Sequence, residues 1–191
     1  MKQIILASTS PRRKEILALL GLKFKVVASD YKENMTLKMP PLKLAKFLSK
    51  GKAQALVKKF PNHLIIGADT FVVQNNKLLG KPKSKAEAKK MLTQISNKKL
   101  TIITGFTIID TENNKSISKA VETKVYIKKL TSKEIENYIK TKEPLDKAGA
   151  FAIQGIGSVL IKKIEGDFFS AVGIPLFSLA QELKKNGIEI L

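Results

Sequence analysis

Short apolar runs and segments of helical periodicity alternate along this chain. Residues 4–7, 24–28 and 64–68 are apolar runs with the length of buried strands, and residues 11–20 and 41–60 repeat apolar positions at helical spacing. Because strands and helices follow one another in this way, the pattern predicts an α/β fold with a central sheet flanked by helices.

The rest of the chain continues the same alternation. Two predicted helices start at capping boxes, formed by Ser84 with Glu87 and by Thr131 with Glu134. The other predicted strands, and the last helix, cover residues 71–73, 77–79, 100–110, 120–127, 150–153, 159–165 and 175–185. At 191 residues the chain can form one large domain or two lobes around a substrate cleft.

The first strand ends in a small polar loop that starts with Ser8. Ser10 is then the expected N-cap of a helix whose first residue is Pro11. Arg12 and Arg13 follow, so two cations lie at the positive end of the helix dipole. Such an arrangement, together with the free amides of a helix start, favours an anion.

The composition supports this interpretation of the two arginines. The chain has 35 Lys and Arg residues, and only Arg12 and Arg13 are arginine. A guanidinium recognises phosphate through two parallel hydrogen bonds, which an ammonium cannot make. We therefore expect Ser8, Arg12 and Arg13 to bind phosphate, and the alternative is a solvated basic helix start.

Two carboxylates occupy positions suited to chemistry. Asp69 and Thr70 follow the predicted strand 64–68, and ligands of open α/β sheets bind at the carboxyl ends of strands. Glu33 and Asp69 offer oxygen ligands for Mg²⁺ or Mn²⁺, and Asp69 is also the best candidate for a general base. The alternative for Asp69 is that it caps a turn.

Three further polar residues are candidates for binding. Lys52 interrupts the apolar face of the helix predicted at 41–60, where it either extends to solvent or reaches into a site. Lys81 lies in a stiff loop before a proline and could bind a triphosphate. Gln154 precedes two nearby glycines, and its amide could pair with the polar edge of a pyrimidine or else satisfy loop backbone.

Composition excludes several classes of site and of protein. The chain has no cysteine and a single histidine, His63, which excludes disulfides, thiolate zinc sites and a conventional Ser-His-Asp triad. No apolar stretch is long enough for a transmembrane helix, so we expect a soluble, cytoplasmic protein. The net charge of +19 could indicate a nucleic-acid-binding protein, but the lysines are spread along the chain.

Four motifs resemble the Maf family of nucleoside triphosphate pyrophosphatases. They are LASTSPRR from Leu6, GADT from Gly67, GKP from Gly80 and EPLDKAGAFAIQG from Glu143, and they occur in family order over nearly the whole chain. The resemblance implies a single Maf-like domain over residues 1–191, with a mixed, twisted sheet and two lobes around a substrate cleft. This sequence departs from the family pattern at residues 96–100, where relatives usually carry a histidine.

The resemblance also implies an activity and roles for particular residues. It implies hydrolysis of a nucleoside triphosphate to the monophosphate and pyrophosphate, as a housecleaning activity. From the two carboxylates we expect this activity to need Mg²⁺ or Mn²⁺, and a homodimer is an expectation that the sequence leaves open. Lys52 would bind substrate, and Arg12, Thr70 and Gln154 would determine substrate choice. The motifs look like the branch that acts on dTTP and UTP rather than the branch that prefers 7-methyl-GTP.

Overall fold

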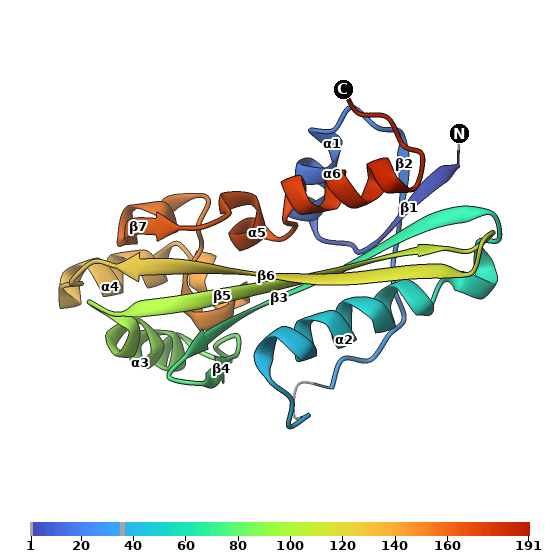
Figure 1. Ribbon diagram of the computed structural model, residues 1–191. Coiled ribbons are helices and arrows are strands. Elements are labelled where there is room, and N and C mark those ends of the chain that lie inside the picture. Colours follow the sequence, from blue (N-terminus) through green and yellow to red (C-terminus); the bar gives the residue numbers. More distant parts are fainter. Residues whose placement is uncertain (1, 35–36) are drawn as a thin grey trace. The chain divides into compact units, whose positions relative to one another are not determined.

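The computed structural model describes residues 2–34 and 37–191, and it contains a mixed sheet flanked by helices. Seven strands pair in the order β2-β1-β3-β5-β6-β7, and β4 pairs with β3 (Figure 1). The predicted fold class is thereby confirmed. The chain divides into two compact units, unit 1 (Met1–Thr70, Ile103–Val121 and Phe169–Leu191) and unit 2 (Phe71–Ile102 and Glu122–Phe168).

Unit 1 is built around three parallel strands. β1 (Gln3–Ala7) lies between β2 (Phe24–Val27) and β3 (His63–Gln74) and pairs with both in parallel. The chain passes from β1 to β2 through α1 (Pro11–Ala18), then returns across β1 to β3 through α2 (Pro41–Gln54). The strand order therefore reverses at β1, and the carboxyl ends of the strands at such a reversal form the usual ligand site of α/β sheets.

Two glycines allow the backbone of α2 to touch the sheet of unit 1. A Cβ atom on Gly67 of β3 would lie 2.3 Å from the carbonyl oxygen of Ser49. On Gly105 of β5 (Lys99–Asp110), a Cβ would lie 2.2 Å from the carbonyl oxygen of Ala45. Within unit 1, α2 covers one face of the sheet and α6 (Leu176–Lys185) covers the other (Figure 1).

The apolar side of α2 forms a core with the parallel strands. Ile5 and Ile65, which are register neighbours on β1 and β3, are fully buried together with Ala53 and Leu56. The apolar periodicity of this segment predicts that Ala45, Leu48, Lys52 and Leu56 face inward, and all four are buried. The helix ends earlier than predicted, at Gln54, and a short 3₁₀ turn follows at Val57–Lys59.

Unit 2 contains one hairpin, a second antiparallel strand pair and two capped helices. β4 (Lys77–Leu79) pairs antiparallel with β3 across Asn75 and Asn76, both with positive φ as a tight hairpin requires. β7 (Ile161–Glu165) pairs antiparallel with β6 (Lys115–Ile127). In both α3 (Lys85–Ile95) and α4 (Ser132–Lys140) the predicted N-cap side chain accepts a hydrogen bond from the amide three residues later.

Two sequence-based strand predictions were wrong. The strands predicted at 64–68 and 71–73 are not separate: they form one continuous strand, β3, whose last residues pair with β4 in the predicted hairpin. The strand predicted at 150–153 is absent: Gly149 and Ala150 both have positive φ, and the short 3₁₀ turn η3 (Ala148–Ala150) takes its place. A left-handed backbone cannot continue a strand.

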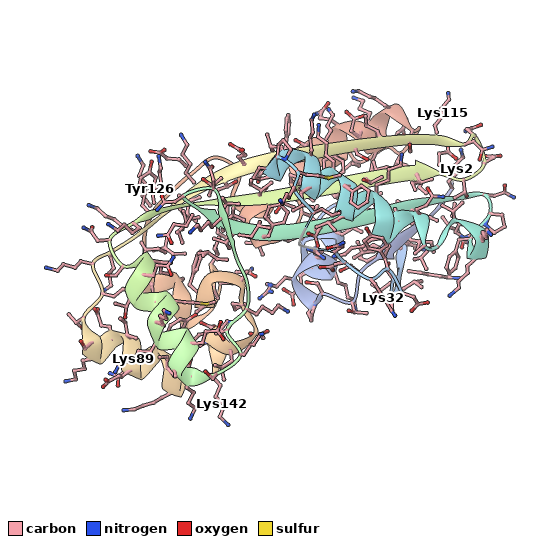
Figure 2. The ribbon with its side chains drawn as sticks, turned by 90° about the horizontal axis from the view of Figure 1, so that it is seen from below. Lys2, Lys32, Lys89, Lys115, Tyr126 and Lys142 are labelled. Carbon is pink, nitrogen blue, oxygen red and sulfur yellow. The ribbon has the colours of Figure 1, made fainter. Side chains whose placement is uncertain are left out.

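Lysine side chains project outward from both units (Figure 2). Lys32 and Lys115 in unit 1 and Lys89 and Lys142 in unit 2 are exposed. The positive charge is thus spread over the surface of each unit, as the sequence indicated. In the described part of the chain, no helix has both the length and the apolar character needed to cross a membrane.

We expect Asp110 to make the stability of unit 1 depend on pH. Its carboxylate, at the end of β5, accepts hydrogen bonds from Lys2 and from the backbone and side chain of Asn113. Burial raises the pKa of Asp110, but these hydrogen bonds outweigh it and lower the pKa from 3.8 to about 2. The stabilisation is therefore complete above about pH 4 and is lost as the pH falls through 2.

The substitution Asp110→Asn tests this expectation in unfolding experiments between pH 2 and pH 6. We expect a loss on the order of 1 kcal/mol at pH 6 that shrinks towards pH 2. The control is Glu112→Gln, because Glu112 also pairs with Lys2, at 2.8 Å, but its side chain is 53% exposed. An equal effect of both substitutions, or no dependence on pH, would contradict the prediction.

Candidate active site

The helix start after β1 is open to an anion. Ser10 is the N-cap of α1 and Pro11 is its first residue, as predicted, but the Ser10 side chain makes no capping hydrogen bond. No acidic residue lies in the first turn. Within residues 2–34 and 37–191, the backbone amides of Arg12 and Arg13 donate to no acceptor. They remain available to a ligand.

Arg13 is held in one orientation by three oxygen atoms. Its Nε donates to the carbonyl oxygen of Gly173 at 3.2 Å, Nη1 donates to Ser8 Oγ at 3.2 Å, and Nη2 donates to Thr70 Oγ1 at 3.4 Å. A guanidinium has five N–H groups, so one on each Nη remains for a ligand. Burial lowers the pKa of Arg13, while the charges of Asp69 and Glu33 raise it.

The close packing of Arg13 explains a glycine in the loop after α5 (Phe168–Val172). Gly173 has a φ of 151°, and a Cβ there would lie 3.2 Å from Cγ of Arg13. A side chain at this position would therefore strain the backbone and press on the arginine. No local pattern predicts this contact, since the two residues are 160 positions apart.

Lys52 joins two carboxylates. Its ammonium lies 2.5 Å from Oδ1 of Asp69 and 2.7 Å from Oε1 of Glu33. Lys52 and Asp69 are both buried, and Glu33 is partly exposed. Of the two alternatives for Lys52, the structure shows the inward orientation. A buried ammonium is stable only with such partners, so the three charges form one unit.

A small clasp holds the Glu33 loop against α2. The Tyr31 ring lies over Gly51, so closely that a Cβ on Gly51 would be 2.3 Å from the ring. Ser29 Oγ donates to the carbonyl oxygen of Lys52 and accepts from the amide of Tyr31. These contacts bring Glu33 to Lys52. The sequence predicted Glu33 as a metal ligand beside Asp69 but not its ion pair with Lys52.

Asp69 and Thr70 lie within β3, not at its carboxyl end as predicted. The register of β1 with β3 ends at Leu6 and Ile66, so both residues lie beyond the end of β1. The strand that ends at the site is therefore β1. Since successive side chains of a strand point to opposite faces, Asp69 meets Lys52 and Thr70 meets Arg13.

The other predicted site residues stand apart from this network. Arg12 is partly exposed and forms no hydrogen bond or ion pair with a described residue. Lys81 and Gln154 belong to unit 2, where both are exposed and their side chains form no hydrogen bond or ion pair with a described residue. Their roles stay predictions.

In unit 2, Glu143 fixes the backbone that follows Gln154. Its carboxylate accepts hydrogen bonds from the amides of Ile156 and Gly157, at 3.2 and 2.7 Å. A Cβ on Gly155 would lie 2.1 Å from Oε1 of Glu143. This glycine therefore makes room for the Glu143 carboxylate.

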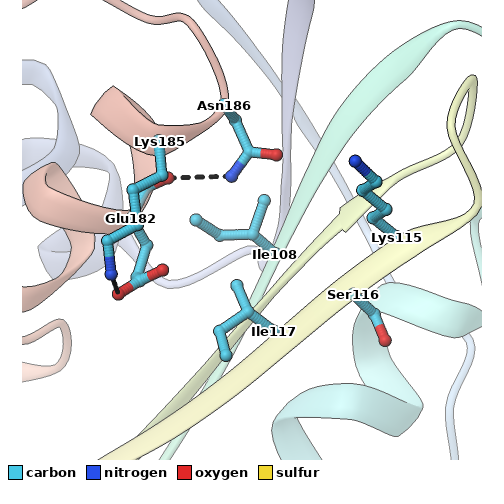
Figure 3. Close-up of a pocket in the computed structure, with 7 residues that line it drawn as sticks. All are labelled: Ile108, Lys115, Ser116, Ile117, Glu182, Lys185 and Asn186. Carbon is cyan, nitrogen blue, oxygen red and sulfur yellow. Dashed lines mark hydrogen bonds and ion pairs between the residues drawn. The ribbon is translucent and has the colours of Figure 1, made fainter.

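Unit 1 also contains a pocket that shares no residue with the Arg13 and Lys52 networks. It lies between the β5-β6 hairpin and α6, and its residues are Ile108, Lys115, Ser116, Ile117, Glu182, Lys185 and Asn186 (Figure 3). Its carboxylate, Glu182, is already paired with Lys119 and Lys185 at 2.7 and 2.8 Å. None of the residues that line it belongs to the Arg13 or Lys52 networks.

Fold and site together define an α/β protein with a charged site at the carboxyl end of parallel strands. The fold is similar to that of a HAM1 protein from Coxiella burnetii, with a TM-score of 0.54 and 15% identity over 97% of this chain and 100% of that one. The family model described as Maf-like protein matches residues 3–186. This chain belongs to the Maf family.

Relatives within the family are similar over their whole length. A dTTP/UTP pyrophosphatase of Methanosarcina barkeri is 49% identical, over 100% of this chain and 97% of the relative. A dTTP/UTP pyrophosphatase of Bacillus anthracis is 42% identical, over 100% of this chain and 98% of the relative. The predicted family membership is confirmed.

We expect Gly51→Ala to destabilise the protein, although alanine normally stabilises a helix interior by about 0.5–1 kcal/mol. The added Cβ would displace the Tyr31 ring, which lies 2.3 Å away. In a Tyr31→Ala background the same substitution should instead stabilise, because nothing remains to be displaced. Thermal unfolding of the four proteins in this cycle measures the coupling. Equal effects in both backgrounds would show that the clasp is absent.

Proposed function

We propose that this protein hydrolyses dTTP and UTP to the monophosphate and pyrophosphate. The observation that carries the proposal is the Lys52 cluster beside Arg13, in a chain that is 42–49% identical over its length to proteins named dTTP/UTP pyrophosphatase. A triphosphate needs positive charge and directed N–H groups around its oxygens, and unit 1 offers both.

In the proposed complex, phosphate oxygens bind at the start of α1. The remaining N–H groups of Arg13 and the amides of the first turn donate to them. Ser8 Oγ already accepts from Arg13 and from the amide of Ser10, so its own hydrogen is free to point towards the ligand. Arg12 adds a cation beside them, and Lys81 of unit 2 is a further candidate.

Asp69 is the proposed general base. Its carboxylate takes a proton from water while the water oxygen bonds to the α-phosphorus, and the bond from that phosphorus to the bridging oxygen breaks. Pyrophosphate leaves with the electron pair of that bond. Lys52 holds Asp69 through Oδ1, and no described residue forms a hydrogen bond to Oδ2, which can therefore face the water.

The carboxylates also fit a divalent cation. Glu33 and Asp69 both contact the Lys52 ammonium, so their oxygens converge. Among the residues that the structure describes, no group of three or more acidic, histidine or cysteine side chains could hold a metal alone. Mg²⁺ often binds through one or two carboxylates, with water and phosphate completing its shell. It would supply charge neutralisation on the triphosphate.

Other sequence-based predictions remain part of the proposal. Gln154 would read the pyrimidine, and Thr70 would contribute to substrate choice. A cytoplasmic location, homodimer formation and a housecleaning role stay predictions. Each is compatible with the proposed chemistry but does not follow from it.

A nucleotide panel tests the proposed function. Pyrophosphate release is measured with dTTP, the four ribonucleoside triphosphates and 7-methyl-GTP, with Mg²⁺ present, and we expect dTTP and UTP to be hydrolysed fastest. A preference for the methylated purine would retain the chemistry but overturn the substrate. No release from any nucleotide, together with salt-dependent binding to DNA or RNA, would support a nucleic-acid-binding protein instead.

Gln154→Ala should reduce base selectivity more than the maximal rate. A site that pairs with the polar edge of a pyrimidine rejects bases that leave its groups unpaired, and this discrimination should fall by about tenfold or more. Steady-state kinetics on UTP and CTP measure it. Gln181→Ala, at an exposed position of α6, is the control and should keep the selectivity. Unchanged selectivity in Gln154→Ala would remove the residue from the proposal.

Asp69→Asn should lower turnover by about a hundredfold or more, in a protein that stays folded. The control is Asp30→Asn, because Asp30 is exposed and pairs only loosely with Lys59, at 3.3 Å. Activity should also disappear in excess chelator and return with Mg²⁺ or Mn²⁺. Full activity in the chelator would contradict the cation, and full activity of Asp69→Asn would contradict the base.

A further inference from the structure

A buried threonine behind the phosphate site has no role in the chemistry described above. Thr104 lies on β5 and is fully buried. Its Oγ1 lies 2.9 Å from Oγ1 of Thr70 and 2.7 Å from the carbonyl oxygen of Ser170. Thr70 in turn accepts a hydrogen bond from Arg13. The hydroxyl of Thr104 is thus one step removed from the guanidinium.

The donor and acceptor roles in this series of hydrogen bonds follow from the two groups that end it, the Ser170 carbonyl and the Arg13 guanidinium. A hydroxyl has one hydrogen, and the carbonyl of Ser170 can only accept. Thr104 therefore donates to Ser170, the nearer partner at 2.7 Å, and shares the same hydrogen with Oγ1 of Thr70 at 2.9 Å. The hydrogen of Thr70 points to the carbonyl oxygen of Gly173, 3.5 Å away. Thr70 then presents lone pairs to Arg13.

Without Thr104, only the longer hydrogen bond to the carbonyl oxygen of Gly173 would orient the Thr70 hydroxyl. The hydroxyl could then turn its lone pairs away from the guanidinium, and the contact from Nη2 would be lost. Arg13 would keep Ser8 and Gly173 but lose one of its three acceptors. A side chain that must hold two N–H groups towards phosphate is sensitive to such a loss, because misorientation of a binding group reduces rate.

We propose that Thr104 is a positioning residue that orders the Thr70 hydroxyl and thereby fixes the Arg13 guanidinium for triphosphate binding. The inference rests on the proposed function. It concerns the hydrogen bond from Arg13 to Thr70, which would serve the phosphates that all substrates share, and not the base contact assigned to Gln154. It therefore predicts an equal loss for all nucleotides.

The same strand provides a matched control. Thr107 is also fully buried on β5, and its hydroxyl bonds to Ser49 and Ser118 at 2.9 and 2.8 Å. It is three positions from Thr104, so it points to the opposite face, towards α2. Thr107→Val removes a hydroxyl that is as buried as that of Thr104. Its hydrogen-bond partners do not connect it to Arg13. A general effect of losing a buried hydrogen bond would appear in both variants.

Kinetics on dTTP, UTP and CTP form the first measurement. We expect Thr104→Val to lower kcat/KM at least tenfold for all three nucleotides. Thr104→Ser, which restores the hydroxyl, should come within about threefold of the natural protein. Thr107→Val should remain within about twofold. Thermal unfolding of each variant shows that they are folded under the assay conditions.

The second measurement observes Arg13 without any nucleotide. Because the chain has only two arginines, a protein labelled with ¹⁵N-arginine gives two Nε–H signals, and Arg12→Lys assigns them. The Nε of Arg13 donates to Gly173, so its signal should exchange slowly with water. We expect faster exchange and a shifted signal in Thr104→Val, and no change in Thr107→Val or Thr104→Ser.

The outcomes separate this inference from the proposed function. If the natural protein releases no pyrophosphate, the proposed function fails, and the arginine signals still report on positioning. If it is active and Thr104→Val matches Thr107→Val in kinetics and in the Arg13 signal, Thr104 is only structural. A loss confined to one nucleotide would also overturn the inference, because it would place the effect at the base.

Discussion

An ammonium group that is removed from water requires anionic partners, and Lys52 imposes this requirement on unit 1. Its two partners come from different segments, Asp69 from β3 and Glu33 from the loop after β2. Removing Lys52 would leave the buried Asp69 carboxylate without its cation, which is far more costly than losing a surface ion pair. The cluster thus ties a helix, a strand and a loop to one arrangement.

That arrangement depends on how closely α2 approaches the sheet. Gly67 and Gly105 place helix backbone directly on β3 and β5, where any side chain would collide with a carbonyl oxygen of α2. At this short distance, Lys52 reaches Asp69 on the neighbouring strand. Each of these glycines lacks a side chain where another part of unit 1 packs directly against the backbone. At Gly67 and Gly105 that part is the backbone of α2, and at Gly51 it is the Tyr31 ring.

The site itself results from unequal strand lengths. β1 ends at Ala7 while β3 runs on to Gln74, so the edge of β3 beside the loop after β1 is left without a strand neighbour there. Arg13 and Lys52 reach this edge from opposite faces, through Thr70 and Asp69. Because adjacent residues of a strand point in opposite directions, two consecutive residues connect the proposed phosphate-binding part to the carboxylate cluster.

Local patterns in the sequence were sufficient for most elements and for the identity of the charged residues. Apolar periodicity, capping boxes and the Asn75-Asn76 turn depend on neighbouring residues, and the start of α1 at Pro11 needs only its own sequence. The paired arginines were recognisable because the chain has no other arginine, and Asp69 was recognisable because it follows a predicted strand. The strand predicted at 150–153 failed because its neighbours in space, and not its own sequence, determine the backbone there.

Only the tertiary structure decided which of these residues touch. Spacing left open whether Lys52 faces solvent or a site, since one carboxylate comes from a loop without periodicity and the other from a strand. The contacts of Arg13 with Gly173 and, through Thr70, with Thr104 join segments 160, 57 and 34 positions apart. A local pattern carries no information about such distances in sequence, because packing of the whole sheet brings the segments together.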